Sequence, residues 1–207
     1  NSTEKPDEPD VAEAKPRYIW IDAAANFPDY ANSKENIAKD MEKIKAAGFT
    51  DIIVDVRPTT GDVLFNTNVV DQVKRMDVWG NSGYSYYERT ETWDYLQAFI
   101  EEARIQGLKV NASINTFVGG YLCPYNLGHD GVLFRDESKK GWASVANLAD
   151  GLTNTMDLLD DETDYGAKFF NPANDDVQNF VLQLLADLAK YDLDGIILDR
   201  CRYDDYG

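Results

Sequence analysis

Apolar and polar positions along the chain follow two periods in turn, and these predict four strands separated by three helices. Short apolar runs of the kind found in parallel sheets cover residues 18–21, 51–57, 108–114 and 195–198. Between them, apolar residues at helical spacing predict amphipathic helices after Asn32 or Ser33, over residues 92–107, and after Asn174 or Asp175. Because residues 195–198 carry only glycine and aliphatic side chains, we expect that strand to be covered on both faces.

The order of these elements is typical of two α/β architectures, an open doubly wound sheet or a (β/α) barrel. Residues 23–27, after the first strand, contain none of the glycines of a dinucleotide-binding loop. Long segments, residues 59–90 and 116–174, follow the second and third strands, whereas the helix-to-strand turns are short. This asymmetry favours a (β/α)8 barrel of the TIM type, with an elaborated catalytic face. Since four strands are half of such a barrel, we expect this chain to contain its first four strands.

The chain divides into a short tether and one domain. Residues 1–16 are rich in proline and acid without periodicity, which predicts a flexible tether. Residues 17–207 are expected to form the N-terminal half of the barrel. Such a tether suits an exported protein that has lost its signal peptide, in the periplasm or at the cell surface, with membrane contact only through a lipid anchor. Cys123 and Cys201 follow adjacent strands, so a disulfide is conceivable there.

Charge and composition exclude several classes of function. A net charge of −17 argues against nucleic acid and anionic membranes as partners, because both attract basic patches. The single histidine, His129, leaves little for a histidine-based metal site or catalytic triad, and no cofactor is expected. Aromatic residues make up 12 % of the chain and suit neutral sugars, although most aromatic side chains belong to cores.

Polar residues gather where the predicted strands end, and this is where parallel α/β proteins carry function. Several such groups at one rim of an apolar barrel are costly to bury without a use or a partner. Asp192 and Asp194 instead precede their strand, so we expect them to stabilise a turn or a helix end. The strand-end candidates are Asp22, Asp55, Arg57, Asn115, Asp199 and Arg202.

Glycoside hydrolysis would use such an arrangement, because it needs one ionised and one protonated carboxyl group. Asp199 is our candidate for the ionised member, with its pKa lowered by Arg57 or Arg202. A residue beyond the end of this chain competes for the second role with Asp22, Asp55 and Asp62.

Two further hypotheses concern sugars and metals. Aromatic residues of the long segments could stack on sugar rings, although most of them should pack the segments themselves. As a weaker alternative, Asp22, Asp55 and Asp199 could hold Mg²⁺ or Ca²⁺ in a metal-dependent hydrolase, since both ions prefer oxygen ligands. The aromatic candidates are Trp79, Tyr84, Tyr86, Tyr87, Tyr121, Tyr125 and Trp142.

Four blocks of the sequence resemble one family, in the family's order. They are residues 48–65, 99–115, 171–177 and 191–203, and together they are similar to the glycosyl-hydrolase-like family 10. These are bacterial proteins, often lipoproteins, related to the amylase-type barrel glycosidases. The chain departs from the family's pattern where Asp55, Asn111 and Thr116 replace its usual glutamine, histidine and proline.

The resemblance implies a (β/α)8 barrel that hydrolyses glycosidic bonds, with Asp199 as nucleophile and a general acid outside this chain. We therefore expect a retaining glycoside hydrolase acting on a bacterial cell-wall, dietary or host polysaccharide. The alternative is a non-catalytic glycan-binding or scaffold barrel. Substrate-binding roles are expected for Asp22, Asp55, Arg57, Asn115, Arg202 and Tyr121.

Overall fold

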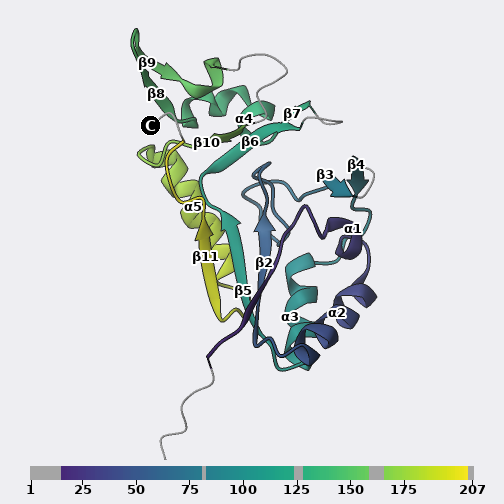
Figure 1. The fold of residues 1–207 in the computed structure, drawn as a ribbon. Coiled ribbons are helices and arrows are strands. Elements are labelled where there is room, and N and C mark those ends of the chain that lie inside the picture. The colour runs from purple at the N-terminus through teal and green to yellow at the C-terminus, as the bar shows by residue number, and fades with distance from the viewer. Residues whose placement is uncertain (1–14, 81–82, 124–127, 159–165, 205–207) are drawn as a thin grey trace, which may run out of the picture.

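A four-stranded parallel sheet forms the centre of the molecule (Figure 1). The computed structural model describes residues 15–80, 83–123, 128–158 and 166–204, so residues 1–14 of the predicted tether lie outside the described part. The predicted order of strands and helices is confirmed, with bounds within a few residues of those expected. The strands are β1 (Tyr18–Ile21), β2 (Asp51–Arg57), β5 (Lys109–Asn115) and β11 (Gly195–Asp199), and the helices between them are α2 (Lys34–Ala46), α3 (Tyr95–Ile105) and α5 (Asp175–Leu188).

The strands lie in the sheet in the order in which they occur along the chain, β1-β2-β5-β11, and every neighbouring pair is parallel. Each right-handed crossover therefore adds its strand on the same side, which places the connecting helices on one face. A doubly wound sheet reverses its strand order at a switch point, and the described residues contain no such reversal. Closure into an eight-stranded barrel stays a prediction, because the described sheet is open at β1 and β11.

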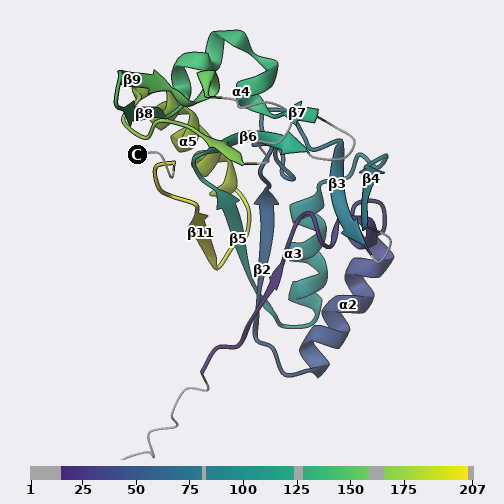
Figure 2. The ribbon, with the colours of Figure 1, turned by 45° about the horizontal axis from the view of Figure 1, so that its top comes forward.

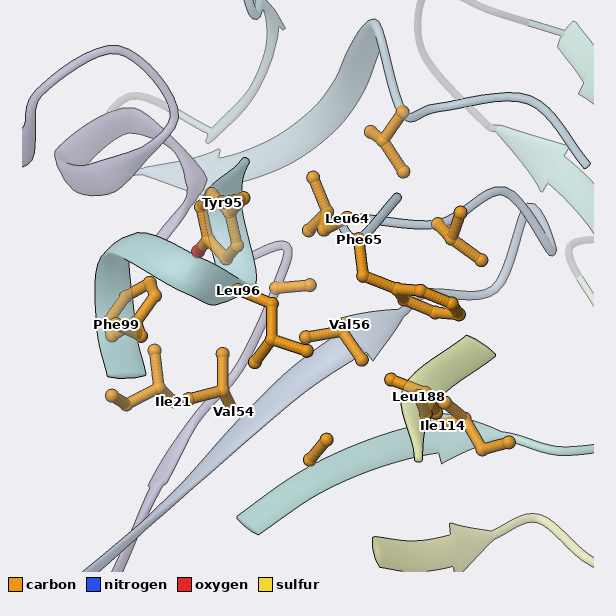
Figure 3. Packing of buried hydrophobic residues seen from close by; sticks show 14 of the residues in the cluster. Ile21, Val54, Val56, Leu64, Phe65, Tyr95, Leu96, Phe99, Ile114 and Leu188 are labelled. Atoms are coloured by element: carbon orange, nitrogen blue, oxygen red, sulfur yellow. The ribbon is translucent and has the colours of Figure 1, made fainter. Parts of the chain in front are cut away.

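The hydrophobic core lies between this sheet and the helices. β2 is buried along its whole length, and its alternate residues Val54 and Val56 belong to the same cluster as Leu96 and Phe99 of α3 (Figure 3). Residues at even spacing on a strand share a face, so the residues between them, including Asp55, point to the opposite side. The opposite face of the sheet is the one that carries the polar strand-end residues.

The expectation that β11 is covered on both faces is wrong for the described residues. Ile196 is 36 % exposed and Leu198 is 45 % exposed, because β11 pairs only with β5 and forms an edge of the described sheet. An apolar run thus marks a strand without telling how many neighbours that strand has.

Two predicted helix caps are confirmed. The hydroxyl of Ser33 accepts a hydrogen bond from the Asn36 amide at 3.1 Å, and the Asn174 side-chain oxygen accepts one from the Asp176 amide at 2.8 Å. Both contacts satisfy main-chain donors that a helix leaves open in its first turn. Gly48 ends the first long helix with a positive φ of 87°, which glycine adopts without steric cost.

The two long segments contain more structure than the sequence predicted. They form small sheets and short helices that gather beyond the carboxyl ends of the central strands (Figure 2). Short strands with few apolar residues give weak periodicity, so sequence reasoning treated these stretches as loops. The elements are the hairpin of β3 (Arg75–Gly80) and β4 (Gly83–Glu88), the sheet of β6 (Val118–Cys123), β7 (Gly128–Asp130) and β10 (Ala167–Phe169), the hairpin of β8 (Val145–Leu148) and β9 (Gly151–Asn154), the helix α4 (Val132–Arg135), and the 3-10 helices η1 (Glu137–Trp142) and η2 (Thr155–Asp157).

A short helix, α1 (Phe27–Tyr30), follows β1 and packs its two aromatic residues into the core. None of the described helices has both the length and the apolar character that crossing a bilayer requires.

Candidate functional site

A cavity of about 140 Å³ lies at the carboxyl ends of all four central strands. Parallel strands end at one edge of a sheet, so the residues that follow them are brought together there. Of the seven predicted site residues, four line this cavity: Asp22, Asp55, Asn115 and Asp199. We call it the Asp199 cavity, and its remaining lining residues are Trp20, Ala24, Pro58, Thr59, Met76 and Arg200.

Each of its three carboxylates is held by a main-chain amide close to it in the sequence. Oδ1 of Asp22 accepts from the Ala25 amide at 2.7 Å, and Oδ1 of Asp199 accepts from the Arg200 amide at 2.7 Å. Oδ1 of Asp55 accepts from the Arg57 amide at 3.3 Å. Because one oxygen of each carboxylate is fixed by backbone, the orientation of the three groups is set by the strand ends themselves.

Asp55 differs from the other two carboxylates in its burial. It is only 8 % exposed, whereas Asp22 and Asp199 are exposed. Burial, with a smaller contribution from the charges of Asp22 and Asp199, raises the pKa of Asp55 to about 7, against the opposing effect of the Arg57 and Ala23 amides. Near neutral pH the cavity therefore contains a carboxyl group that keeps its proton for part of the time.

The backbone after Asp199 is strained. Arg200 has a positive φ of 44°. Among the described residues, every other positive φ belongs to a glycine. Non-glycine residues in this region cost roughly 1 kcal/mol or more, and such strain clusters at functional sites. The Asp199 carbonyl also accepts a hydrogen bond from the Thr116 amide at 2.8 Å, so the sharp turn after β11 is tied to the end of β5.

Arg57 does not line the Asp199 cavity, although sequence reasoning placed it there. Its side chain is fully buried, and the guanidinium carbon lies 5.7 Å from the ring centre of Phe170 and 5.6 Å from that of Phe180. Nη1 donates hydrogen bonds to the carbonyls of Asn115 and Thr116. The surroundings of Arg57 are those of a structural residue, and its predicted role in substrate binding stays untested.

Arg202 and Tyr121 also lie apart from the lining of the cavity. The guanidinium carbon of Arg202 is 4.8 Å from the ring centre of Phe169, and Nη1 donates to the Tyr203 carbonyl at 3.0 Å. Tyr121 belongs to β6, where it pairs with Ala167 on one side and Asp130 on the other. Neither Arg57 nor Arg202 belongs to the lining of the cavity, and their predicted effect on Asp199 stays a prediction.

Sequence reasoning missed Trp20, which lines the cavity and is 44 % exposed. The signal was present, because Trp20 precedes Asp22 by two residues and a strand repeats its faces every second residue. An exposed indole beside carboxylates combines an apolar ring face with hydrogen-bond acceptors, which is the chemistry that a sugar ring requires.

Two of the aromatic candidates on the long segments, Trp142 and Tyr87, pack against the core. Trp142 lies 5.9 Å from Phe170 and 5.5 Å from Phe180, measured between ring centres. Tyr87 packs edge-on against Phe27 at 6.0 Å. Tyr125 and the side chains of Trp79 and Tyr84 lie outside the described residues.

The remaining candidates have simple surroundings. The His129 ring stacks on Phe134 at 4.9 Å. Cys201 is a free, exposed cysteine, so the disulfide considered for it is not formed, and the side chain of Cys123 lies outside the described residues. Across the described part of the chain, no group of three or more His, Cys, Asp or Glu side chains is placed to hold a metal ion. The metal-dependent alternative therefore gains no support.

Asp192 and Asp194 have the structural role that sequence reasoning predicted. Oδ2 of Asp194 accepts from the Val110 amide at 2.7 Å and from Arg104 Nη1 at 2.7 Å. Asp192 accepts from the same guanidinium at 3.1 Å through its side chain and at 2.8 Å through its carbonyl. The two aspartates fasten the turn before β11 to α3, at the amino end of the sheet.

By sequence, the chain is similar to an S-layer-related protein. No protein-family model matches the chain. It is 29 % identical over 205 residues to an S-layer-related protein of Niallia circulans, covering 95 % of this chain and 12 % of that protein. It thus spans about an eighth of the length of this relative.

Two solved structures with a similar fold are glycosidases. Alpha-L-fucosidase isoenzyme 2 from Paenibacillus thiaminolyticus superposes with a TM-score of 0.56 at 20 % identity, over 90 % of this chain and 23 % of the fucosidase. The alpha-galactosidase AgaB of Geobacillus stearothermophilus gives a TM-score of 0.52 at 11 % identity, over 93 % of this chain and 22 % of that enzyme. The chain has a glycosidase-like α/β fold and spans about a quarter of each of these two proteins. Membership in the glycosyl-hydrolase-like family 10 stays a prediction.

Proposed function

We propose that this chain carries part of the active site of a retaining glycoside hydrolase, with Asp199 as the nucleophile. The observation that carries the proposal is the convergence of Asp22, Asp55 and Asp199 on one cavity at the carboxyl ends of parallel strands. The glycosidase-like fold supports the same reading. Asp199 is exposed and fixed by its neighbouring amide, so it can meet a substrate in a defined orientation.

The proposed reaction has two steps. A carboxylate oxygen of Asp199 attacks the anomeric carbon, while the bond from that carbon to the leaving oxygen breaks and the leaving oxygen takes a proton from a general acid. Water then attacks the anomeric carbon of the glycosyl-enzyme and gives its proton to the conjugate base of the general acid, while the bond from that carbon to Asp199 breaks and releases the carboxylate. We place the general acid in the longer protein outside residues 1–207, because Asp55 is too deeply buried to reach a leaving group freely.

The other groups of the Asp199 cavity would bind the sugar and adjust the charge around Asp199. Trp20 offers a ring face for the sugar, while Asp22 and Asn115 accept or donate hydrogen bonds to its hydroxyls. A partly protonated Asp55 limits the negative charge of the cavity, which leaves Asp199 free to be the anion that attacks. We propose a bacterial cell-wall, dietary or host polysaccharide as substrate, and an exported protein that is tethered by residues 1–16. The S-layer-related relative supports a cell-surface location.

The test uses the longest available form of the protein and a panel of cell-wall, plant and host glycans, with products detected by mass spectrometry. Asp199→Asn should abolish turnover and leave glycan binding nearly intact, because it removes the nucleophile but keeps the shape of the side chain. Asp192→Asn, at the opposite end of the same sheet, is the matched control and should keep full activity. Turnover at the wild-type rate in Asp199→Asn would refute the assignment.

The alternative is a glycan-binding barrel without catalysis. It is favoured by one observation, namely that Asp55, the lining carboxyl group whose pKa is raised, is buried, while the other two carboxyl groups of the lining are exposed. Binding of a glycan without any product, in a protein whose remaining strands are all present, would support this reading over the enzyme.

A further inference from the structure

We propose that a second polar cleft, separate from the Asp199 cavity, binds the extended part of a neutral glycan chain. The cleft consists of two adjoining cavities of about 590 and 310 Å³, whose walls share Asp62, Asp71 and Arg135. We call it the Arg135 cleft. It has no lining residue in common with the Asp199 cavity. The proposal rests on the proposed function for the class of ligand, but its geometry is independent.

Segments that follow the carboxyl ends of β2 and β5 form the walls, and the Arg135 side chain joins the insertion after β2 to the insertion after β5. Arg135 contacts Asp62 Oδ2 through Nη2 at 2.5 Å, Asp130 Oδ1 through Nε at 2.9 Å, and Asp71 Oδ2 through Nη1 at 3.6 Å. Both insertions are thereby fixed to each other around a guanidinium with defined geometry. The cleft is preformed, as ligand sites usually are.

Asp62 is the feature that points to a ligand. It lines both cavities and is only 8 % exposed. Its Oδ2 is bound by Arg135, whereas its buried Oδ1 has no hydrogen-bond donor within the described part of the molecule. Buried acceptors are almost always satisfied, so an oxygen without a donor at the wall shared by both cavities favours a hydroxyl of a ligand there, once the atoms that cover this oxygen move aside.

The charges of the lining define the class of ligand. Five acidic and four basic side chains line the cleft, which is close to balance in a chain of net charge −17. An anion would be repelled by the three carboxylates around Arg135, and a cation would meet Arg135 itself at the centre. A neutral ligand with many donors and acceptors, such as an oligosaccharide, can use side chains of both signs.

The hairpin of β3 and β4 (Figure 2) contributes lining residues both to this cleft and to the Asp199 cavity. Arg75 pairs with Glu88 and Met76 pairs with Tyr87 across the hairpin, and successive residues of a strand point to opposite faces. Arg75 and Glu88, on one face, line the Arg135 cleft, whereas Met76, on the other, lines the Asp199 cavity. Since one hairpin walls both sites, a glycan held at Asp199 can continue over the hairpin into the cleft.

Tyr86 gives the cleft a ring face for a sugar. It is 37 % exposed and lines the smaller cavity. Its hydroxyl is hydrogen-bonded to Glu88, and the guanidinium carbon of Arg75 lies 5.9 Å from its ring centre. These contacts fix the ring while leaving part of it open to the cleft.

Calorimetric binding to the Asp199→Asn protein tests the proposal, with neutral xylan, maltose-type and chitin oligosaccharides of increasing length as probes. Tyr86→Ala should weaken the binding of the long oligosaccharides by about five- to tenfold and leave the shortest ones unaffected. Asn68→Ala, an exposed position on another wall, should also weaken the long ones. The matched control is Tyr18→Ala, which removes a tyrosine that is 52 % exposed at the amino end of β1 and should change nothing.

Three outcomes would overturn the proposal that the Arg135 cleft binds a neutral glycan. These are equal affinities of both cleft variants and the parent protein for long oligosaccharides, tighter binding of sulfated than of neutral oligosaccharides, or no binding of any neutral oligosaccharide. Failure of the cleft can be told apart from failure of the proposed enzyme by turnover. Hydrolysis of short glycosides that depends on Asp199 but not on Tyr86 or Asn68 would support the proposed enzyme even if the Arg135 cleft binds no glycan.

Discussion

Arg57 and Asn115 bind each other reciprocally across neighbouring strands. Nη1 of Arg57 donates to the Asn115 carbonyl, and the Asn115 side-chain amide donates to the Arg57 carbonyl at 2.8 Å. Asn115 nevertheless lines the Asp199 cavity, whereas Arg57 is enclosed by aromatic rings. The pair thus links the ends of β2 and β5, and Asn115 also lines the Asp199 cavity.

Replacing Arg57 should therefore affect stability before it affects binding. Arg57→Ala leaves main-chain carbonyls without a donor and opens a void beside Phe170, so we expect a loss of about 3 kcal/mol in the free energy of unfolding. Arg57→Met should lose less, since it refills the space and removes the cost of burying a charge. Urea unfolding measures both variants. Unchanged stability together with weakened glycan binding would instead show that Arg57 contacts the ligand.

The burial of Asp55 predicts a pH dependence of stability. Its pKa is about 7 in the folded protein and near 3.8 in the unfolded chain, so between these pH values the folded state binds more protons and stability falls as pH rises. Asp55→Asn removes this effect, and its stability should rise relative to wild type from about pH 4 to about pH 7, by as much as about 4 kcal/mol. Above that range the difference should be constant.

Urea unfolding of both proteins across this pH range checks the prediction. Asp150→Asn, in the exposed turn between β8 and β9, is the control and should follow the wild-type profile. A difference between wild type and Asp55→Asn that does not vary with pH would mean that Asp55 is ionised throughout.

The contacts of Asp194 predict an opposite pH dependence at the amino end of the sheet. Burial acts to raise the pKa of Asp194, but the hydrogen bonds from Val110 and Arg104 outweigh it and hold the pKa below its usual value. Asp194→Asn should cost about 1–2 kcal/mol near neutral pH. Because the folded pKa is lowered, this stabilisation is present above the unfolded pKa and disappears as the solution is acidified. Thermal melts at several pH values test this, and glycan binding should not change.

Gly131 should tolerate no side chain. It has a φ of 125° between β7 and α4, and an added Cβ would lie 2.4 Å from the Cα of Gly120 and 2.6 Å from the Thr60 carbonyl oxygen. We expect Gly131→Ala to cost roughly 2–5 kcal/mol. Gly141→Ala is the matched control, because nothing lies within 4 Å of a Cβ there. Equal melting temperatures of the two variants would contradict this packing.

The central sheet could be predicted from the sequence because its signals are local. Consecutive aliphatic residues such as Ile52, Ile53 and Val54 of β2 favour a buried strand, and the caps Ser33 and Asn174 mark where helices begin. Since parallel strands end at one edge, the position of Asp22, Asp55 and Asp199 followed from the same reasoning.

The failures have a common physical cause, which is that contacts distant in sequence decide the direction of a side chain. Asp55 and Arg57, two residues apart, would share a face of a regular strand, but an irregularity in the pairing of β2 with β5 falls between them, and the Arg57 guanidinium lies beside Phe170 and Phe180. Likewise, the small sheets of the long segments depend on pairings such as Tyr121 with Ala167. No local sequence pattern predicts such pairings, because the two residues are far apart in the chain.

The main-chain amides that hold Asp22, Asp55 and Asp199 have a consequence for engineering. Because the anchoring donors belong to the backbone, they persist whatever side chain replaces the aspartate. At this end of the sheet, the three side chains can therefore be replaced while the main-chain donors that orient them are kept. An asparagine, a serine or a longer acid can be installed at any of the three positions to explore new reactions, while the frame that orients the inserted group stays in place.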